Sequence, residues 1–268
     1  MVYRTAEVWA AAAGDELVAR RRRSGRLRPG GSIADMDEGR GREELWVATA
    51  GRVPYREAVA LQERLRDRRQ AGDIPDALLL LEHDPVYTKG RRTTAGDLPL
   101  GDAWYRGRGI DVADTDRGGR VTYHGPGQLV GYPIVRVTDV VEYVRAVERA
   151  LIAALADEGV GAEVRRGLTG VWVGERKIGS IGVHVSRGVT THGFAVNVDN
   201  DLEPFSWVVP CGIAGVRMTS LGEETGRAGG MRCFRRRVAW RLAEALGLRQ
   251  RLVSIARLRG EPALAPIR

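Results

Sequence analysis

The sequence contains few cysteines, few aromatic residues and no long apolar run, and each shortage argues against a class of protein. Two cysteines in 268 residues cannot form the framework of a disulfide-rich secreted scaffold. Aromatic side chains are 6% of the chain, which disfavours a nucleic-acid-binding surface of interleaved basic and aromatic residues. No apolar stretch approaches the roughly 18 residues of a spanning helix, and no signal-peptide pattern is present. We therefore expect a cytoplasmic protein with neither a membrane nor a nucleic-acid partner.

Candidate metal ligands are also scarce. The four histidines are His83, His124, His184 and His192, and the two cysteines are Cys211 and Cys233. The nearest histidine pair is eight residues apart, whereas structural zinc ligands come in closely spaced pairs. We therefore expect no metal site.

Lysine is the rarest charged residue in a basic chain. The formal net charge is +8 and the pI about 10.0, which favours an acidic partner. Only two of the 42 basic residues are lysines, Lys89 and Lys177. Lysine can lose its proton when desolvated and arginine effectively cannot, so a lysine in an arginine-rich chain is a candidate for chemistry. Lys89 lies among other cations and is predicted to be in a solvated loop.

The organisation predicts one folded domain. Residues 1–43 are expected to form a poorly ordered basic extension, residues 44–250 the domain and residues 251–268 a C-terminal tail. Hydrophobic periodicity predicts helices over 55–69, 139–158 and 234–246, with Asp139 capping the second. Short apolar or alternating runs predict strands over 45–50 (an edge strand), 77–82, 120–123, 129–137, 171–173, 177–185 and 193–198. The fold class is therefore α+β, a single domain with a mixed, largely antiparallel sheet flanked by helices.

Four segments could carry chemistry. Residues 117–128 place glycines on both sides of a short strand, typical of either a ligand-binding wall or an ordinary hairpin. Lys177 begins a glycine-rich strand, either as a functional cation or as an edge residue that discourages aggregation. His192 opens a third such strand and is more typical of a structural histidine. Cys211, between Pro210 and Gly212, is held at a sharp turn suited to an exposed nucleophile. Cys233 is predicted to be partly buried and inert.

Together these segments resemble the lipoyl(octanoyl) transferase family, which has the biotin/lipoate ligase-like fold. The resemblance rests on R-G-G-x-x-T-Y-H-G-P-G-Q at 117–128, K-I-G-S-I-G at 177–182, H-G-F-A-V-N at 192–197 and P-C-G-I at 210–213. It extends from about residue 45 to about residue 248.

The resemblance implies an acyltransferase that uses no metal or nucleotide cofactor. Cys211 would take an octanoyl group from octanoyl-acyl carrier protein as a thioester, and Lys177 would lower the pKa of the thiol. The acceptors would be lysines of lipoyl-domain proteins, namely E2 subunits of 2-oxoacid dehydrogenases and the glycine cleavage H protein. The implied substrate-binding residues are Arg117, Gly118, Gly119, Arg120, Val121, Thr122, Tyr123, His124, Ser180, Ile181, Gly182, Gly193, Phe194 and Ala195. We expect a monomer.

Three alternatives remain open at this point. An ATP-dependent lipoate or biotin ligase would need an adenylate site and would not use Cys211 as a nucleophile. A cysteine hydrolase would pair Cys211 with His124 or His192 as base and use water as acceptor. A non-enzymatic nucleic-acid-binding domain is motivated by the pI alone.

Overall fold

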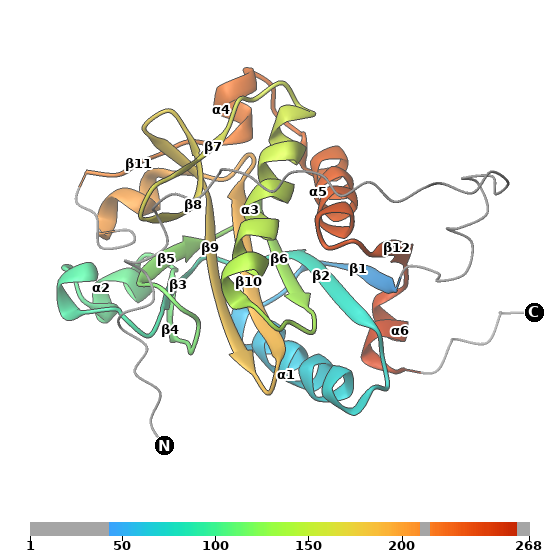
Figure 1. Cartoon of the computed structure of the whole chain (residues 1–268). Helices are drawn as coiled ribbons and strands as arrows, with labels where there is room; N and C mark the ends of the chain where they lie inside the picture. The colour runs from blue at the N-terminus through green and yellow to red at the C-terminus, as the bar shows by residue number, and fades with distance from the viewer. Residues whose placement is uncertain (1–42, 210–214, 262–268) are drawn as a thin grey trace, which may run out of the picture. The chain divides into compact units, whose positions relative to one another are not determined.

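The computed structural model describes residues 43–209 and 215–261 and arranges them around one large mixed sheet (Figure 1). Its strands are β1 (Glu44–Arg52), β2 (Asp76–Glu82), β6 (Gln128–Ile134), β7 (Glu163–Arg165), β8 (Leu168–Val173), β9 (Arg176–Ser186), β10 (Val189–Asn197), β11 (Arg217–Met218) and β12 (Arg249–Leu252). They run in the order β12-β1-β2-β6-β10-β9-β8-β7, and β11 pairs with β9 beside this path. The pairs β1–β12, β1–β2 and β9–β11 are parallel, and the rest are antiparallel. The predicted fold class is confirmed.

Helices cover both faces of this sheet because its central strands alternate between two apolar cores. The main helices are α1 (Tyr55–Ala71), α3 (Val140–Ala156), α5 (Met231–Ala245) and the short α6 (Ile255–Arg259). On β2, Leu78 and Leu80 pack with α3 and α5, whereas Leu79 and Leu81 pack with α1 and α6. A continuous apolar strand is therefore buried on both sides, as its composition predicts.

A second, three-stranded sheet carries the glycine-rich motif. It has the order β4-β3-β5, with β3 (Val86–Lys89), β4 (Asp111–Asp114) and β5 (Val121–His124). Its own core contains Tyr87, Tyr105, Val112 and Phe205. The short helices associated with it are α2 (Asp102–Gly107) and the 3-10 turns η2 (Ala95–Asp97) and η3 (Glu203–Trp207), and α4 (Leu221–Thr225) follows β11.

The predicted cap of the second helix is present. Asp139 Oδ1 accepts hydrogen bonds from the backbone N–H groups of Val141 and Glu142, at 2.8 and 3.0 Å. Two of the otherwise unsatisfied donors at the start of α3 are thereby paired. The predicted helix over 139–158 is confirmed as Val140–Ala156.

Four local predictions differ from the structure. The strand over 45–50 is not at an edge, because β12 pairs with its outer side. Residues 251–259, predicted as part of a tail, include the end of β12 and all of α6; both are too short to show a periodicity. Lys89 ends β3, and its Nζ pairs with carboxylates of Asp102 and Asp114 at 3.6 and 3.1 Å. Cys233 is exposed at the start of α5, not partly buried.

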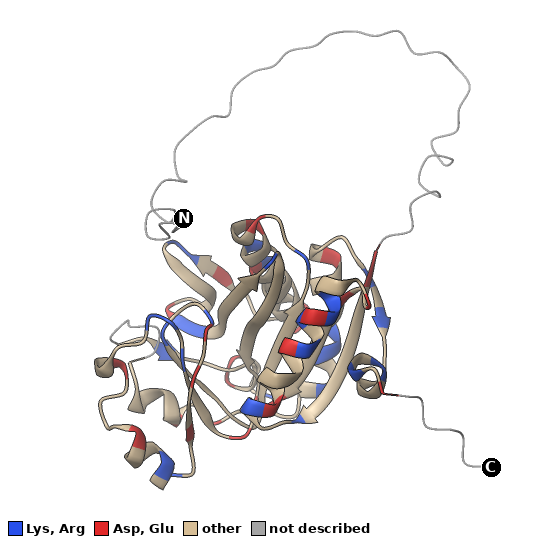
Figure 2. Ribbon diagram, turned by 90° about the horizontal axis from the view of Figure 1, so that it is seen from below, with Lys and Arg blue, Asp and Glu red and all other residues tan. Residues whose placement is uncertain are grey.

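Charged residues lie mainly on the helices and loops, whereas the central strands are almost uncharged (Figure 2). Among residues 43–209 and 215–261, none of the helices is long and apolar enough to cross a bilayer.

Candidate active site

The two glycine-rich strands predicted to bind substrate lie side by side. In the β9–β10 pairing, Gly182 stands opposite Gly193, Ile181 opposite Phe194 and Ser180 opposite Ala195. The predicted substrate-binding residues Ser180–Gly182 of β9 are thus the direct cross-strand partners of Gly193–Ala195 of β10. They come from motifs separated in sequence by the turn after β9, and the sheet register makes them one surface.

The third predicted segment is joined to this surface by backbone contacts. The loop between β4 and β5 donates a hydrogen bond from Gly118 N to Val183 O on β9, at 2.9 Å. A Cβ on Gly182 would lie 2.9 Å from Gly118 O, closer than real Cβ atoms normally approach an atom. Only glycine at position 182 therefore lets the loop lie directly on β9. The loop is also bonded to the chain after β3, through Arg91 N to Arg117 O and Arg92 N to Gly119 O, at 3.1 and 3.0 Å.

Arg117 is buried and its guanidinium is directed at β3. Its Nη2 donates to Thr88 O at 2.6 Å and to Thr88 Oγ1 at 2.7 Å, while Nη1 donates to Gly118 O at 3.0 Å. His124 lies on the other side of the Thr88 hydroxyl, with Nε2 3.4 Å from Oγ1. Arg117 therefore braces the loop against the small sheet.

The predicted residues of β5 divide between two faces. Val121 and Tyr123 pack into the core of the small sheet, and the Tyr123 ring contacts Tyr87 and Phe205. His124 points the other way, where it stacks on Tyr55 with ring centroids 6.3 Å apart. Because side chains alternate along a strand, those of Val121 and Tyr123 lie on the opposite face of β5 from His124. On β10, Phe194 likewise packs with α3 and α5, whereas Ala195 packs on the α1 side.

Lys177 is buried near the start of β9, with 2% of its surface exposed. Its Nζ lies 5.5 Å from the centre of the Trp172 ring on β8. A Cβ on Gly170 would lie 2.8 Å from Lys177 Cε and 2.5 Å from Gly179 O, and Gly170 has φ +122°. The missing side chain at position 170 therefore leaves the space through which the lysine chain runs. Gly170 is itself fixed by a hydrogen bond from its N–H to the buried Glu148 carboxylate of α3, at 3.2 Å.

A cluster of buried histidine and tyrosine side chains lies beside His124 and was not predicted as part of the site. His83 donates from Nδ1 to Val53 O and accepts at Nε2 from the Tyr132 hydroxyl, both at 2.7 Å. Burial lowers the pKa of His83 to about 4 and that of His124 well below its usual value. Both rings are therefore neutral at neutral pH, and they act as hydrogen-bonding groups rather than as charges.

Cys211, the predicted nucleophile, lies outside the described residues. The structure does describe the chain on either side of residues 210–214. Val209 N donates to Asp97 O, and Thr219 N donates to Lys177 O, both at 3.0 Å. Asp97 in turn accepts from Arg120 Nη1 at 3.1 Å. The segment before residue 210 and the segment after residue 214 therefore each contact a residue that belongs to, or directly supports, the candidate site.

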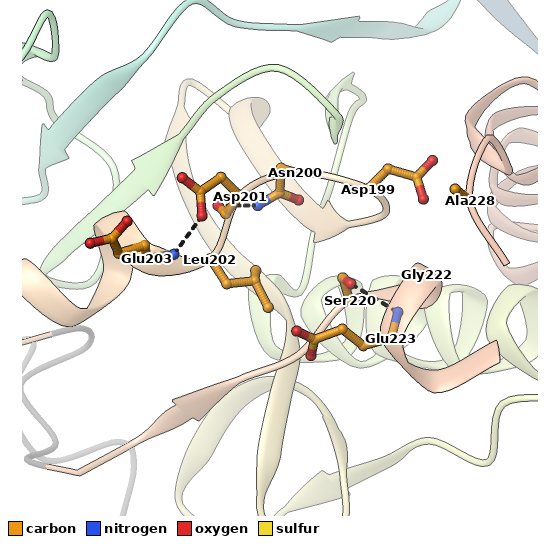
Figure 3. Close-up of a pocket in the computed structure, with 9 residues that line it drawn as sticks. All are labelled: Asp199, Asn200, Asp201, Leu202, Glu203, Ser220, Gly222, Glu223 and Ala228. Atoms are coloured by element: carbon orange, nitrogen blue, oxygen red, sulfur yellow. Dashed lines mark hydrogen bonds between the residues drawn. The ribbon is translucent and has the colours of Figure 1, made fainter. Parts of the chain in front are cut away.

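An acidic pocket of about 480 Å³ lies between the chain that leaves β10 and helix α4 (Figure 3). None of the predicted site residues that the structure describes lines it. Its carboxylates accept hydrogen bonds from nearby backbone: Asp201 Oδ1 from Glu203 N at 2.9 Å, and Asp199 Oδ2 from Gly229 N at 2.9 Å. These acidic residues thus order the connections that precede η3 and α5.

Comparison with known proteins decides the family. Residues 54–243 match the family described as the lipoyl protein ligase A/B catalytic domain. The octanoyltransferase of Thermobifida fusca is 45% identical over 223 residues, which are 79% of this chain and 91% of that protein. The octanoyltransferase of Mycobacterium ulcerans is 48% identical over 212 residues, covering 75% and 87% of the two chains. The chain belongs to the octanoyltransferase family. It is therefore an acyltransferase of lipoate biosynthesis, as its motifs imply.

Solved structures show that the octanoyltransferase fold is shared with lipoate ligases. A lipoate protein ligase from Thermoplasma acidophilum superposes with a TM-score of 0.64 at 18% identity, covering 82% of this chain and 90% of that one. A lipoate-protein ligase A bound with ATP gives a TM-score of 0.62, also at 18% identity, with 82% and 91% covered. At this identity the likeness establishes the fold alone, so the reaction must be argued from the site.

Proposed function

We propose that this chain transfers an octanoyl group from octanoyl-acyl carrier protein to a lysine of a lipoyl-domain protein, through a thioester on Cys211. Lys177 is assigned the task of favouring the thiolate. Residues Ser180–Gly182 of β9, Gly193–Ala195 of β10 and the loop before β5 are assigned to bind the acyl group, and together they are called the acyl-binding surface.

The observation that carries the proposal is the burial of Lys177 in a glycine-lined space. Lysine is seldom buried to 2% exposure, because a buried cation loses its hydration, and position 177 is one of only two lysines in an arginine-rich chain. An ammonium group near a thiol favours the thiolate by charge attraction. Family membership and the contact between Thr219 and Lys177 both support placing the cysteine segment beside it.

The reaction divides into two acyl transfers. In the first, the Cys211 thiolate attacks the octanoyl thioester, a new carbon–sulfur bond forms and the carrier thiolate leaves and takes up a proton. In the second, the neutral amine of the acceptor lysine attacks the Cys211 thioester, the amide forms, the amine loses a proton and the Cys211 thiolate leaves. Splitting the transfer this way replaces one difficult step by two easier ones. The donor is already a thioester, so no nucleotide is consumed.

The partners are assigned by the same argument. The net charge of +8 suits acidic protein partners, since charge complementarity accelerates encounter. The donor would be octanoyl-acyl carrier protein. The acceptors would be the lipoyl domains of E2 subunits and the H protein.

The test is incubation of the purified protein with octanoyl-acyl carrier protein in the absence of ATP, followed by intact and peptide mass spectrometry. We expect a hydroxylamine-sensitive octanoyl adduct on Cys211 that is chased to the lysine of an apo lipoyl domain. The Cys211→Ala variant should form no adduct, whereas the matched Cys233→Ser variant should form it normally.

Two outcomes would replace the proposal. Acylation of the domain only with ATP and free octanoate would assign the chain to ligase chemistry. An adduct that is released only as free octanoate, even with the acceptor domain present, would favour a cysteine hydrolase.

A further inference from the structure

The loop that carries Arg117, Gly118 and Gly119 is also bound by side chains of the main sheet. Asp116 precedes it and lies between two histidines on neighbouring strands. His192 Nε2 of β10 donates to Asp116 Oδ1 at 2.6 Å, and His184 Nε2 of β9 lies 3.5 Å from Asp116 Oδ2. The carboxylate therefore links the loop to β9 and β10, the two strands of the proposed acyl-binding surface.

The two sides of this contact differ in exposure. The Asp116 side chain is 58% exposed, whereas the His192 side chain is 5% exposed. The hydrogen bond from His192 is the main cause that lowers the pKa of Asp116 to about 2. The carboxylate is thus ionised throughout the physiological range, and the buried imidazole gives it a fixed position.

His192 has an unusual backbone conformation for a residue within a strand. Its φ is +57°, and the only other non-glycine residue with positive φ in the described ranges is Arg187 in the β9–β10 turn. A non-glycine residue in this region is strained, and such strain tends to be kept where it serves a site. The backbone N–H of His192 is directed at Gln62 of α1 and donates to its Oε1 at 2.7 Å. Helix α1 thereby fixes the position from which the imidazole reaches Asp116.

A metal site does not explain the arrangement. No group of three His, Cys, Asp or Glu side chains among residues 43–209 and 215–261 is placed to hold a metal ion. The remaining neighbours are those of a hydrogen-bonded brace: Thr115 Oγ1 lies 3.4 Å from His192 Nε2, and the Tyr132 ring packs against the imidazole.

We propose that Asp116 and His192 are positioning residues that hold the Arg117–Gly119 loop against β9 and so keep the acyl-binding surface assembled. This inference rests on the proposed function, because it assigns the acyl group to that surface. In this assignment His192 acts through the loop, by its hydrogen bond to Asp116, and not on the reacting atoms. Its loss should therefore weaken donor binding more than it slows chemistry on bound donor.

The main variants are Asp116→Ala, which removes the acceptor, and His192→Asn, which removes the donor. Asparagine tolerates positive φ, and its short amide cannot reach Asp116, so His192→Asn removes the contact without adding backbone strain. Asp114→Ala is the matched control, because Asp114 is two residues away and its side chain, 88% exposed, pairs with Lys89 on the surface. We measure steady-state kinetics with octanoyl-acyl carrier protein, thermal stability, and hydrogen exchange of the peptide containing Gly118.

We expect KM for the donor to rise about fivefold to tenfold in each main variant, the range of a charge-assisted hydrogen bond that is partly exposed, with kcat within about twofold. Exchange of the Gly118 amide should accelerate, since that amide is bonded to Val183 O. The double variant should be no worse than Asp116→Ala, because that change already removes the contact to His192 as well as the one to His184. Asp114→Ala should match the parent.

Unchanged KM and unchanged Gly118 exchange in both main variants would overturn the inference. A fall in kcat that merely follows a lower melting temperature would also overturn it and make the pair a general stabiliser. Failure of the parent to form a Cys211 adduct would instead refute the proposed function, and the exchange measurement would still decide whether the pair holds the loop.

Discussion

The buried histidine beside the site makes stability depend on pH in a window that can be worked out. His83 has a folded-state pKa of about 4, against an ordinary value of 6.5, chiefly because burial disfavours its charged form. Below the unfolded pKa, the unfolded chain binds a proton that the folded chain does not, so unfolding becomes easier as pH falls. The stability is fully present above about pH 7 and is lost between pH 6.5 and about 4.

The magnitude is large enough to measure. At 1.36 kcal/mol for each pKa unit, this single histidine costs about 2 kcal/mol between pH 7 and pH 5. That is a considerable part of the roughly 5–15 kcal/mol that stabilises a typical domain. His124 adds to the loss in the same direction, because burial also lowers its pKa. Most carboxylates remain ionised above pH 5 and contribute little in this range.

The assay is urea unfolding at pH 7, 6 and 5 for the parent and for His83→Asn. Asparagine can still donate to Val53 O, as Nδ1 of His83 does, but it cannot take up a proton. We expect His83→Asn to be less stable than the parent at pH 7 and to lose about 2 kcal/mol less than the parent between pH 7 and pH 5.

The control is Tyr132→Phe, which removes the hydroxyl that donates to His83 Nε2 but leaves the titrating ring. This variant should be less stable at every pH while keeping most of the parent's pH dependence. If His83→Asn loses as much stability as the parent on going from pH 7 to pH 5, the buried neutral histidine is not the cause and the reasoning fails.

Three further predictions concern single positions. Gly170→Ala should lower kcat about tenfold, because its Cβ would displace the Lys177 side chain. The control Gly167→Ala should keep kcat, because Gly167 also has positive φ but no atom lies within 4 Å of its Cβ. Equal kcat values in the two variants would refute this reasoning. Asp139→Ala should destabilise the fold by about 1 kcal/mol through loss of the α3 cap, and an unchanged urea midpoint would contradict the cap's role. Cys233→Ser should retain full activity and remove the reaction with thiol reagents at α5, as peptide mapping would check.

The sequence predicts the helices and strands that bury a regular apolar pattern. Helix α3 has both a cap and an apolar stripe, and β2 is a continuous apolar run, so each could be located from the sequence. The small sheet was only partly anticipated. Its strands β3 and β4 are four residues long and were not predicted, because so short a run does not show alternation reliably.

The candidate site shows the same division. Glycine density identifies the loop at 117–119 and the strands at 177–182 and 192–197 as unusual, and a family resemblance then assigns their roles. Neither source reveals that Gly182 and Gly193 are cross-strand partners, because register depends on the whole sheet. Nor does the sequence indicate that the side chains of Val121 and Tyr123 on β5 point into the core of the small sheet.

The contact between Asp116 and His192 is not predicted for a different reason: the sequence does not single out Asp116, and it indicates a structural histidine at position 192. They lie 76 residues apart, and a lone histidine in a strand is more typical of a structural residue. The informative signal is the positive φ of His192, which is seen only in the structure. No sequence pattern predicts a positive φ for a non-glycine residue. Strain of this kind persists only where surrounding contacts over-determine it, here the hydrogen bonds to Gln62 and Asp116.

The contacts around β9 also explain why the candidate site needs so many glycines. The loop before β5 and the side chain of Lys177 both approach backbone that a Cβ would block, at Gly182 and Gly170. Each glycine costs conformational entropy on folding, so the close approach must be held by other interactions. The buried guanidinium of Arg117, the Asp116–His192 contact and the Glu148 bond to Gly170 N provide them. Arg117, Asp116 and Glu148 are therefore best understood as braces for a surface that is itself mostly backbone and apolar, which suits an octanoyl chain with a single reactive carbonyl.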